Sequence, residues 1–181
     1  RRGIRPGKKI PTDICSYKHI IHKVVTHRPC RFFRLRLEGI MPWKISIDPD
    51  VNCVFIKHYG VVTIDDILNT AEDIFNHPGH RAGMSILRDL SEHGIQPDIH
   101  YKSLAEKSKA MIRAFGPRIG LCKTAFVVGD GQNYAKVHQF TVAGRLGDYP
   151  IERKPFRDIE NALRWLDLPE DYRINYPQAA E

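Results

Sequence analysis

The sequence predicts one α/β domain with a mixed, mostly parallel sheet of about five strands and about four helices, in the order ββαβαβαβα. Two observations carry this prediction. Short apolar runs that suit strands alternate with amphipathic stretches of about 10–15 residues that suit helices, which is typical of parallel strands joined by crossover connections. The run Ala125–Val128 is apolar throughout, as expected for a strand in the middle of a sheet that is covered on both faces.

The first two strands are expected to form an antiparallel hairpin. Ile45–Ile47 alternates apolar and polar side chains, and a second run extends from Cys53 to Tyr59 before Gly60. The intervening Asp48–Asp50 supplies residues that favour a turn.

The next segment predicts a helix that begins after Thr63. Thr63 and Asp66 have approximately the spacing of a capping box, in which the threonine side chain accepts a hydrogen bond from a free amide of the first turn. Apolar side chains then recur at intervals of three and four, which gives the helix one apolar face: Ile64, Ile67, Leu68, Ala71, Ile74 and Phe75. His77–Gly79 is expected to end it.

A third strand, Ser85–Asp89, is followed by a loop over residues 91–97 and a second helix. Pro97-Asp98 is expected to open this helix, and Gly116-Pro117 to stop it. Its core-facing stripe consists of Tyr101, Leu104, Ala105, Ser108, Met111, Ile112 and Phe115.

The last third of the chain predicts the remaining elements. Gly129–Gly131 turns the chain into a third helix, roughly residues 132–142, which Gly144 ends. A final strand follows over residues 149–154. Asp158 then caps a last helix, whose apolar face consists of Ile159, Ala162, Leu163 and Leu166.

Charge divides the chain at Met41. Residues 1–40 contain eleven Lys/Arg and two acidic residues and carry +9, whereas the remaining 17 basic and 19 acidic residues give −2 of the total of +7. We therefore expect a basic leader over residues 1–40, a domain over residues 41–170 and a polar tail over residues 171–181. No apolar run approaches the ~18–20 residues of a membrane span.

Three interpretations of the leader stay open. Met41 is the initiator and the leader is not part of the native domain, or the leader is a disordered basic arm, or it is a targeting peptide. The lack of a Met and of a helical period before Met41 favours the first, and the scarcity of serine (only Ser16) argues against the third. We expect any binding of nucleic acid or anionic lipid to reside in residues 1–40, through salt-sensitive charge neutralisation.

Four groups of residues carry a resemblance to a known family: the hairpin that ends at Gly60, Thr63–Ile67, His77–Arg81 leading into Leu87–Leu90, and Phe156–Leu166. On the basis of these four groups, residues 43–168 resemble the SpoIIAA-like proteins of the STAS/Sec14-like group. The resemblance implies a small STAS-like α/β domain, similar to anti-sigma-factor antagonists and to one part of the Sec14 lipid-binding fold. Most members of this branch have no assigned activity.

One departure from the family concerns its phosphorylation switch. The antagonist branch carries a serine at the start of the helix after the third strand, usually in an Asp-Ser-x-Gly setting. Here Ser91 lies in the loop that follows Asp89, and the helix is expected to open with Pro97-Asp98. The departure argues against a partner-switching mechanism.

Candidate ligand-binding residues follow two predicted strands. Asp89, Ser91 and His93 lie beyond the carboxyl end of the third strand, where ligands bind in open α/β sheets. Gly129 and Asp130 precede a helix whose free amides suit an anion. The plainer alternatives are that Asp89 accepts hydrogen bonds from loop amides and that the second segment is a turn. Neither segment has a G-x-S-x-G elbow or a complete dinucleotide motif.

These residues do not form a recognisable catalytic set. Our first hypothesis is therefore a non-enzymatic regulatory or protein-interaction module, with an unknown protein partner or a second copy of the chain. The second, which the Sec14 resemblance implies, is a carrier of a small apolar ligand or lipid. The third is a hydrolase-type enzyme that uses the loop Asp89–His93. A cavity lined by Ile and Phe side chains that holds a bound apolar molecule would favour the carrier, and a dry, filled core the interaction module.

The cysteines indicate neither a zinc site nor a disulfide framework. No CxxC motif and no Cys/His pair at zinc spacing occurs, so we expect no metal and no cofactor. Cys53 and Cys122 lie in predicted strands and suit buried, reduced thiols, which favours a cytoplasmic location.

Overall fold

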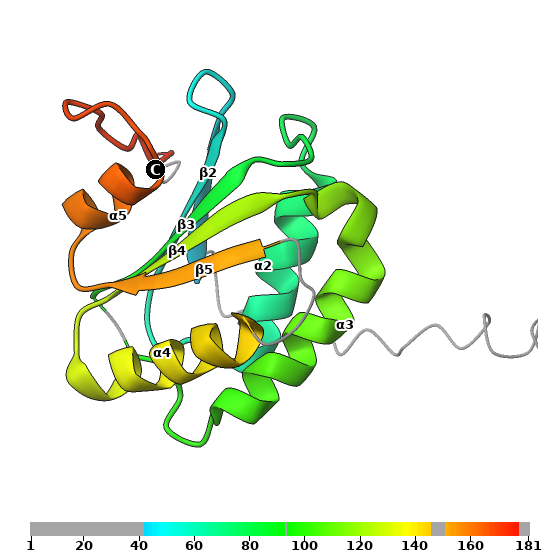
Figure 1. Ribbon diagram of the computed structural model, residues 1–181, viewed down its shortest axis with the longest axis vertical. Helices are drawn as coiled ribbons and strands as arrows, with labels where there is room; N and C mark the ends of the chain where they lie inside the picture. The colour runs from blue at the N-terminus through cyan, green and yellow to red at the C-terminus, as the bar shows by residue number, and fades with distance from the viewer. Residues whose placement is uncertain (1–41, 93, 146–150, 178–181) are drawn as a thin grey trace, which may run out of the picture. The chain divides into compact units, whose positions relative to one another are not determined.

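The computed structural model describes residues 42–177 except residue 93 and residues 146–150 (Figure 1). The predicted basic leader lies outside the described residues, as does the candidate His93. The elements are β1 (Trp43–Asp48), β2 (Cys53–His58), α2 (Ile64–Asn76), β3 (Ser85–Leu90), α3 (Tyr101–Ile119), β4 (Cys122–Val128), α4 (Gly131–Arg145), β5 (Ile151–Phe156) and α5 (Ile159–Trp165). This order is the predicted one.

The strands form one sheet in the order β1-β2-β3-β4-β5. β1 and β2 pair as an antiparallel hairpin, with Ile45 opposite Ile56, and the other neighbours are parallel. The prediction of a mixed, mostly parallel α/β sheet is therefore confirmed.

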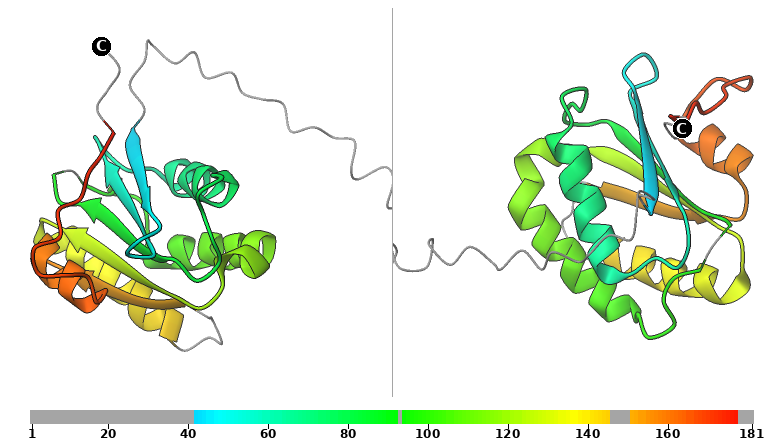
Figure 2. Two further views of the ribbon diagram at one scale, coloured as in Figure 1. Left: turned by 90° about the horizontal axis from the view of Figure 1, so that it is seen from above. Right: turned by 180° about the vertical axis from the view of Figure 1, so that it is seen from behind.

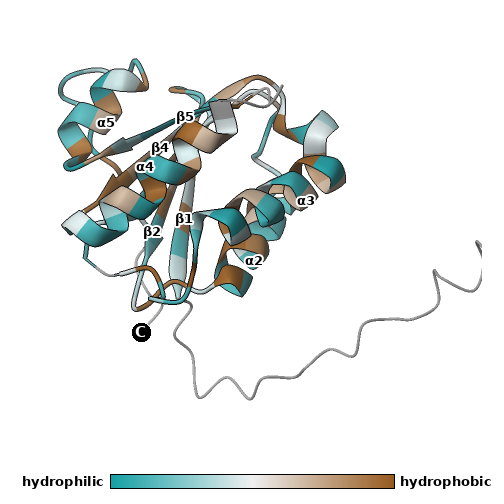
Figure 3. Cartoon of the chain, turned by 60° about the horizontal axis from the view of Figure 1, so that its bottom comes forward, coloured by the Kyte–Doolittle hydropathy of each residue, from teal (hydrophilic) through white to brown (hydrophobic). Residues whose placement is uncertain are grey.

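Helices α2, α3 and α4 cover one face of the sheet, and α5 with the C-terminal segment covers the other (Figures 1 and 2). The helices carry both apolar and polar positions (Figure 3), as expected between a core and solvent. Neighbouring residues of one strand serve different faces, because side chains alternate along a strand. Leu87, for example, packs on the α5 side, whereas Ile86 packs on the α2 side.

Side-chain caps define where two helices begin. Thr63 accepts a hydrogen bond from the amide of Asp66, whose carboxylate accepts one from the amide of Thr63, which confirms the capping box. Asp158 accepts from the amide of Asn161 at the start of α5, as predicted. Each cap satisfies an amide that the first helical turn leaves without a partner.

The limits predicted for α3 were wrong at both ends. The helix begins at Tyr101 and not at Pro97-Asp98, and it runs through Gly116-Pro117 to Ile119. Proline removes one hydrogen bond from a helix interior, but the last turn places Ile119 in the core, where its side chain is fully buried. Burial of apolar surface there offsets the poor local propensity.

Helix α4 also continues past its predicted stop. It includes Gly144, where a Cβ atom would lie only 2.9 Å from Nη1 of Arg153. The glycine therefore makes room for a side chain of β5 and does not end the helix. β5 itself contains Pro155, which is tolerated because β5 is an edge strand.

The C-terminal segment extends the core on the α5 face. Tyr172 stacks on Phe55 with ring centroids 5.4 Å apart, and its hydroxyl donates a 2.7 Å hydrogen bond to Asp48. Ile174 and Tyr176 pack on the same cluster. Part of the segment expected as a polar tail thus covers the sheet.

Candidate functional site

The sequence-predicted residues Asp89 and Ser91 form a local turn. Oδ1 of Asp89 accepts hydrogen bonds from the amide of Ser91 at 3.0 Å and from its hydroxyl at 2.6 Å. Such bonding organises a loop in the way expected of Asx turns. It matches the plainer of the two alternatives for this loop.

Gly129 and Asp130 also have local roles. A Cβ atom on Gly129 would lie 2.3 Å from the carbonyl oxygen of Ser91, so the loops after β3 and β4 are in direct contact and require glycine there. Asp130 accepts from the amide of Asn133 at 2.8 Å, and this hydrogen bond lowers the pKa of its carboxyl group. The structure thus brings Asp89, Ser91 and Gly129 together, but their polar groups stabilise the loops.

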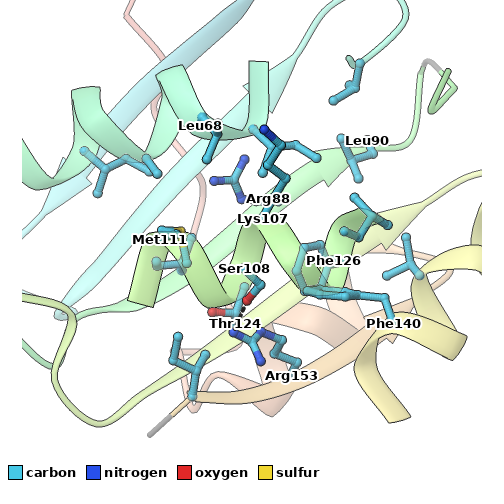
Figure 4. Close-up of a pocket in the computed structure, with 18 of the residues that line it drawn as sticks. Leu68, Arg88, Leu90, Lys107, Ser108, Met111, Thr124, Phe126, Phe140 and Arg153 are labelled. Carbon is cyan, nitrogen blue, oxygen red and sulfur yellow. Dashed lines mark hydrogen bonds between the residues drawn. The ribbon is translucent and has the colours of Figure 1, made fainter. Parts of the chain in front are cut away.

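A cavity lies on the opposite face of the sheet, between the strands and helices α2, α3 and α4 (Figure 4). Its volume is about 90 Å³. Most of its lining is apolar and comes from all three helices and from β3, β4 and β5; it includes Leu68, Ala71, Leu104, Met111, Phe126 and Phe140. The sequence did not predict this cavity.

The polar lining of the cavity is basic. Its members are His58, Arg88, Lys107, Ser108, Thr124 and Arg153. Among the described residues that line the cavity, none is Asp or Glu. The lining therefore combines an apolar surface with three side chains that carry a positive charge at neutral pH.

Arg88 is a buried cation in the middle of the central strand β3. Its Nη1 donates to Nε2 of His58 at 3.2 Å, and no carboxylate in the described part of the chain pairs with it. Burial lowers the pKa of Arg88 to about 10, so the side chain stays charged at neutral pH. The shift corresponds to roughly 3 kcal/mol of unfavourable burial free energy.

His58 is a buried neutral imidazole, with a side chain 2% exposed. Burial, and secondarily the charge of Arg88, lowers the pKa of His58 to about 3. Because a guanidinium group can only donate hydrogen bonds, Nε2 of His58 accepts and the ring proton resides on Nδ1. That Nδ1–H group has no partner among the described residues.

Arg153 lies on β5 at the other end of the cavity, next to Ser108 and Thr124 (Figure 4). Its Nη2 donates to Oγ of Ser108 on α3 at 2.9 Å, and its guanidinium group lies 5.3 Å from the ring centroid of Phe140 on α4. Arg153 therefore ties two helices to the edge of the sheet.

Period-two alternation places these polar residues on the cavity face. His58 is in phase with Ile56, Arg88 with Ile86 and Arg153 with Ile151, and all these apolar neighbours belong to the core under α2 and α3. Counting along each strand could have found the three polar residues, since a charged residue in a strand covered on both faces must be buried. Only the structure shows that the three residues line the same cavity.

Other kinds of site find no support in the described residues. Within residues 42–177, apart from the gaps given above, no group of three His, Cys, Asp or Glu side chains could hold a metal ion. Cys53 and Cys122 are buried thiols, and burial raises the pKa of Cys53 to about 12. No helix in the same residues is long and apolar enough to cross a membrane.

Neither a family model nor a curated protein matches the chain. Among solved structures, it is similar to an uncharacterised protein of the DUF3478 family with a SpoIIAA-like fold, from Shewanella loihica. The two share 17% sequence identity with a TM-score of 0.44, over 71% of this chain and 97% of that one.

Proposed function

We propose that this domain binds a small, largely apolar molecule between its sheet and helices α2, α3 and α4, and acts as its carrier. The observation that carries the proposal is the cavity of about 90 Å³ whose lining is mainly aliphatic and aromatic. Small-molecule sites are commonly apolar cavities with a few convergent polar groups. The cavity has the Ile and Phe lining that the carrier hypothesis expects, and the bound apolar molecule that it also expects is tested by the experiment below.

Helix α3 is suited to control access to the cavity. It packs mainly on α2 and α4, and of its 19 residues only Leu104 and Ile119 are buried. Elements with little buried surface open most readily, because few contacts are lost. A movement of α3 would expose the cavity without disturbing the hydrogen bonds of the sheet.

The volume limits the ligand. A cavity of about 150 Å³ holds one benzene molecule, so a ligand of about five or six carbon atoms enters the present cavity of about 90 Å³ only when α3 moves slightly outward. A ligand the size of a lipid requires a much larger movement of α3. We therefore propose a small metabolite-sized ligand ahead of a membrane lipid.

The other hypotheses remain predictions from the sequence. A regulatory interaction with a protein partner or a second copy has no specific observation in its favour. A hydrolase that uses the loop Asp89–His93 is the least supported, because Oδ1 of Asp89 is already engaged by Ser91. We also propose a cytoplasmic location, which the thiols Cys53 and Cys122 support.

Native mass spectrometry of gently purified full-length chain tests the carrier proposal. We expect a retained mass of a small organic molecule, and we expect Ala71→Leu, which fills the cavity, to remove it. Ala110→Leu, at an exposed position of α3, is the matched control and should retain it. If folded protein carries no ligand and also binds neither benzene nor 3-methylbutanamide in titrations followed by NMR, the proposal is wrong.

A further inference from the structure

Arg88 places a buried positive charge, without a described carboxylate beside it, in the cavity. Arg88, Lys107 and Arg153 line it, and no acidic side chain does so among the described residues. A buried charge is unfavourable unless an opposite charge or several hydrogen bonds compensate it. The uncompensated charge at Arg88 is therefore a feature that a ligand would be expected to satisfy.

Arg88 has the donors that an anion needs. A guanidinium group has five N–H donors in a planar fork, and only the donor to His58 has a partner among the described residues. This fork matches the two oxygens of a carboxylate, and the resulting charge-assisted bonds are stronger than neutral ones. In Figure 4, Arg88 lies beside Leu68 and Lys107, between α2 and α3.

His58 adds a second, independent indication. Its side chain lines the same cavity and contacts Arg88, and its Nδ1 atom is buried without a hydrogen-bond partner in the described residues. The neutral tautomer set by Arg88 makes Nδ1 a donor. An unsatisfied buried donor calls for a further acceptor in the cavity. That acceptor is separate from the group that Arg88 binds, because Nδ1 points away from Nε2.

We infer that the ligand is a small monocarboxylate with an apolar body, its carboxylate bound by Arg88 and its body held against the apolar lining near Phe126 and Phe140. This inference rests on the carrier function proposed above. A carboxylate fits best, because the planar fork of Arg88 matches two oxygen atoms and most of the remaining lining is apolar.

The test compares an acid with its neutral isostere. Isothermal titration of the full-length protein at pH 7 with 3-methylbutanoate and 3-methylbutanamide should show the carboxylate binding about 10- to 100-fold more tightly, the range expected for a charge-assisted hydrogen bond. Arg88→Met should abolish this preference while the amide still binds. Arg113→Met, which removes an equal charge from an exposed position of α3 outside the cavity, should leave it intact.

A second measurement guards against a misfolded variant. The nitrogen chemical shifts of His58 should report a neutral ring protonated on Nδ1 in the wild-type protein, and the signal of Nε2, which accepts from Arg88, should shift when the carboxylate binds. Arg88→Lys should keep part of the preference, since it retains charge but loses the fork.

The outcomes separate this inference from the proposed function. Equal affinity for acid and amide would overturn the inference but leave the carrier function standing. Tighter binding of inorganic phosphate than of the carboxylate would likewise overturn it in favour of a phosphate ligand. If neither the acid, the amide nor benzene binds, both the inference and the carrier function are wrong.

Discussion

The two faces of the sheet use the same strands for different purposes. On the α5 face, Leu87 and Phe55 are fully buried, and Phe55 stacks on Tyr172. On the α2 face, the next residue of β3 is Arg88, which borders a cavity. Dense apolar packing contributes to stability, whereas a buried cation beside a cavity opposes it. The difference supports the proposal that the α2 face, besides its own apolar core, holds a ligand.

The largest difference in the free energy of unfolding is expected between substitutions of Leu87 and of Arg88. These neighbours on β3 point to opposite faces of the sheet. Leu87→Ala should lower the free energy of unfolding by about 2–5 kcal/mol, because it removes fully buried apolar volume. Arg88→Met should leave it unchanged or raise it by about 1–4 kcal/mol, because it replaces a buried charge with an apolar side chain. Urea unfolding measures both.

Leu121→Ala is the control for this comparison, since Leu121 is 80% exposed; it should change the free energy of unfolding by less than about 0.5 kcal/mol. A strong loss of stability in Arg88→Met would contradict the division between the two faces.

The second largest expected effect is a loss of stability at acidic pH that depends on His58. Its folded-state pKa of about 3 lies below the ordinary 6.5, so between these values the unfolded chain binds a proton that the folded chain does not. Stability therefore falls as the pH decreases through this window, by about 3 kcal/mol between pH 6.5 and pH 4 from this group. His58→Gln should make the decline shallower by about that amount in urea unfolding measured across the window.

His138→Gln is the control for the pH experiment, because His138 is exposed and should leave the pH dependence unchanged. Parallel curves for His58→Gln and the wild-type protein would show that His58 is not a neutral, buried group.

The smallest change in the free energy of unfolding is expected for a substitution of Tyr172 on the α5 face. Tyr172→Phe removes the hydroxyl that donates to Asp48 at 2.7 Å but keeps the ring on Phe55. We expect a loss of about 1 kcal/mol in the free energy of unfolding and no change in ligand affinity. Tyr101→Phe, at the exposed start of α3, should change neither quantity. A change in ligand affinity for Tyr172→Phe would mean that the two faces are coupled.

The hairpin and the helix starts could be predicted because their signals are local. Thr63 and Asp66 form the expected capping box, and Asp158 caps α5. The signals failed where tertiary contacts outweighed local propensity. Pro117 did not end α3, because Ile119 gains burial in the core, and Gly144 did not end α4, because the position accommodates Arg153.

The candidate site was harder to predict for a related reason. Polar residues near strand ends, such as Asp89 and Asp130, are the usual candidates for a binding site in a sequence. Here they accept hydrogen bonds from their own loops. Arg88 and His58 sit within apolar strands, and a sequence does not say whether a buried charge is neutralised by a distant acid or left for a ligand.

The sequence by itself determined the order of strands and helices, the caps and the alternation of side chains between the two faces, because each depends on neighbours within a few residues. Only the tertiary structure decided that His58, Arg88 and Arg153 line one cavity and that no described carboxylate accompanies Arg88. Both facts depend on how α2, α3 and α4 pack on the sheet. The spacing between packed elements is set by many side chains at once, and this spacing leaves the cavity between them.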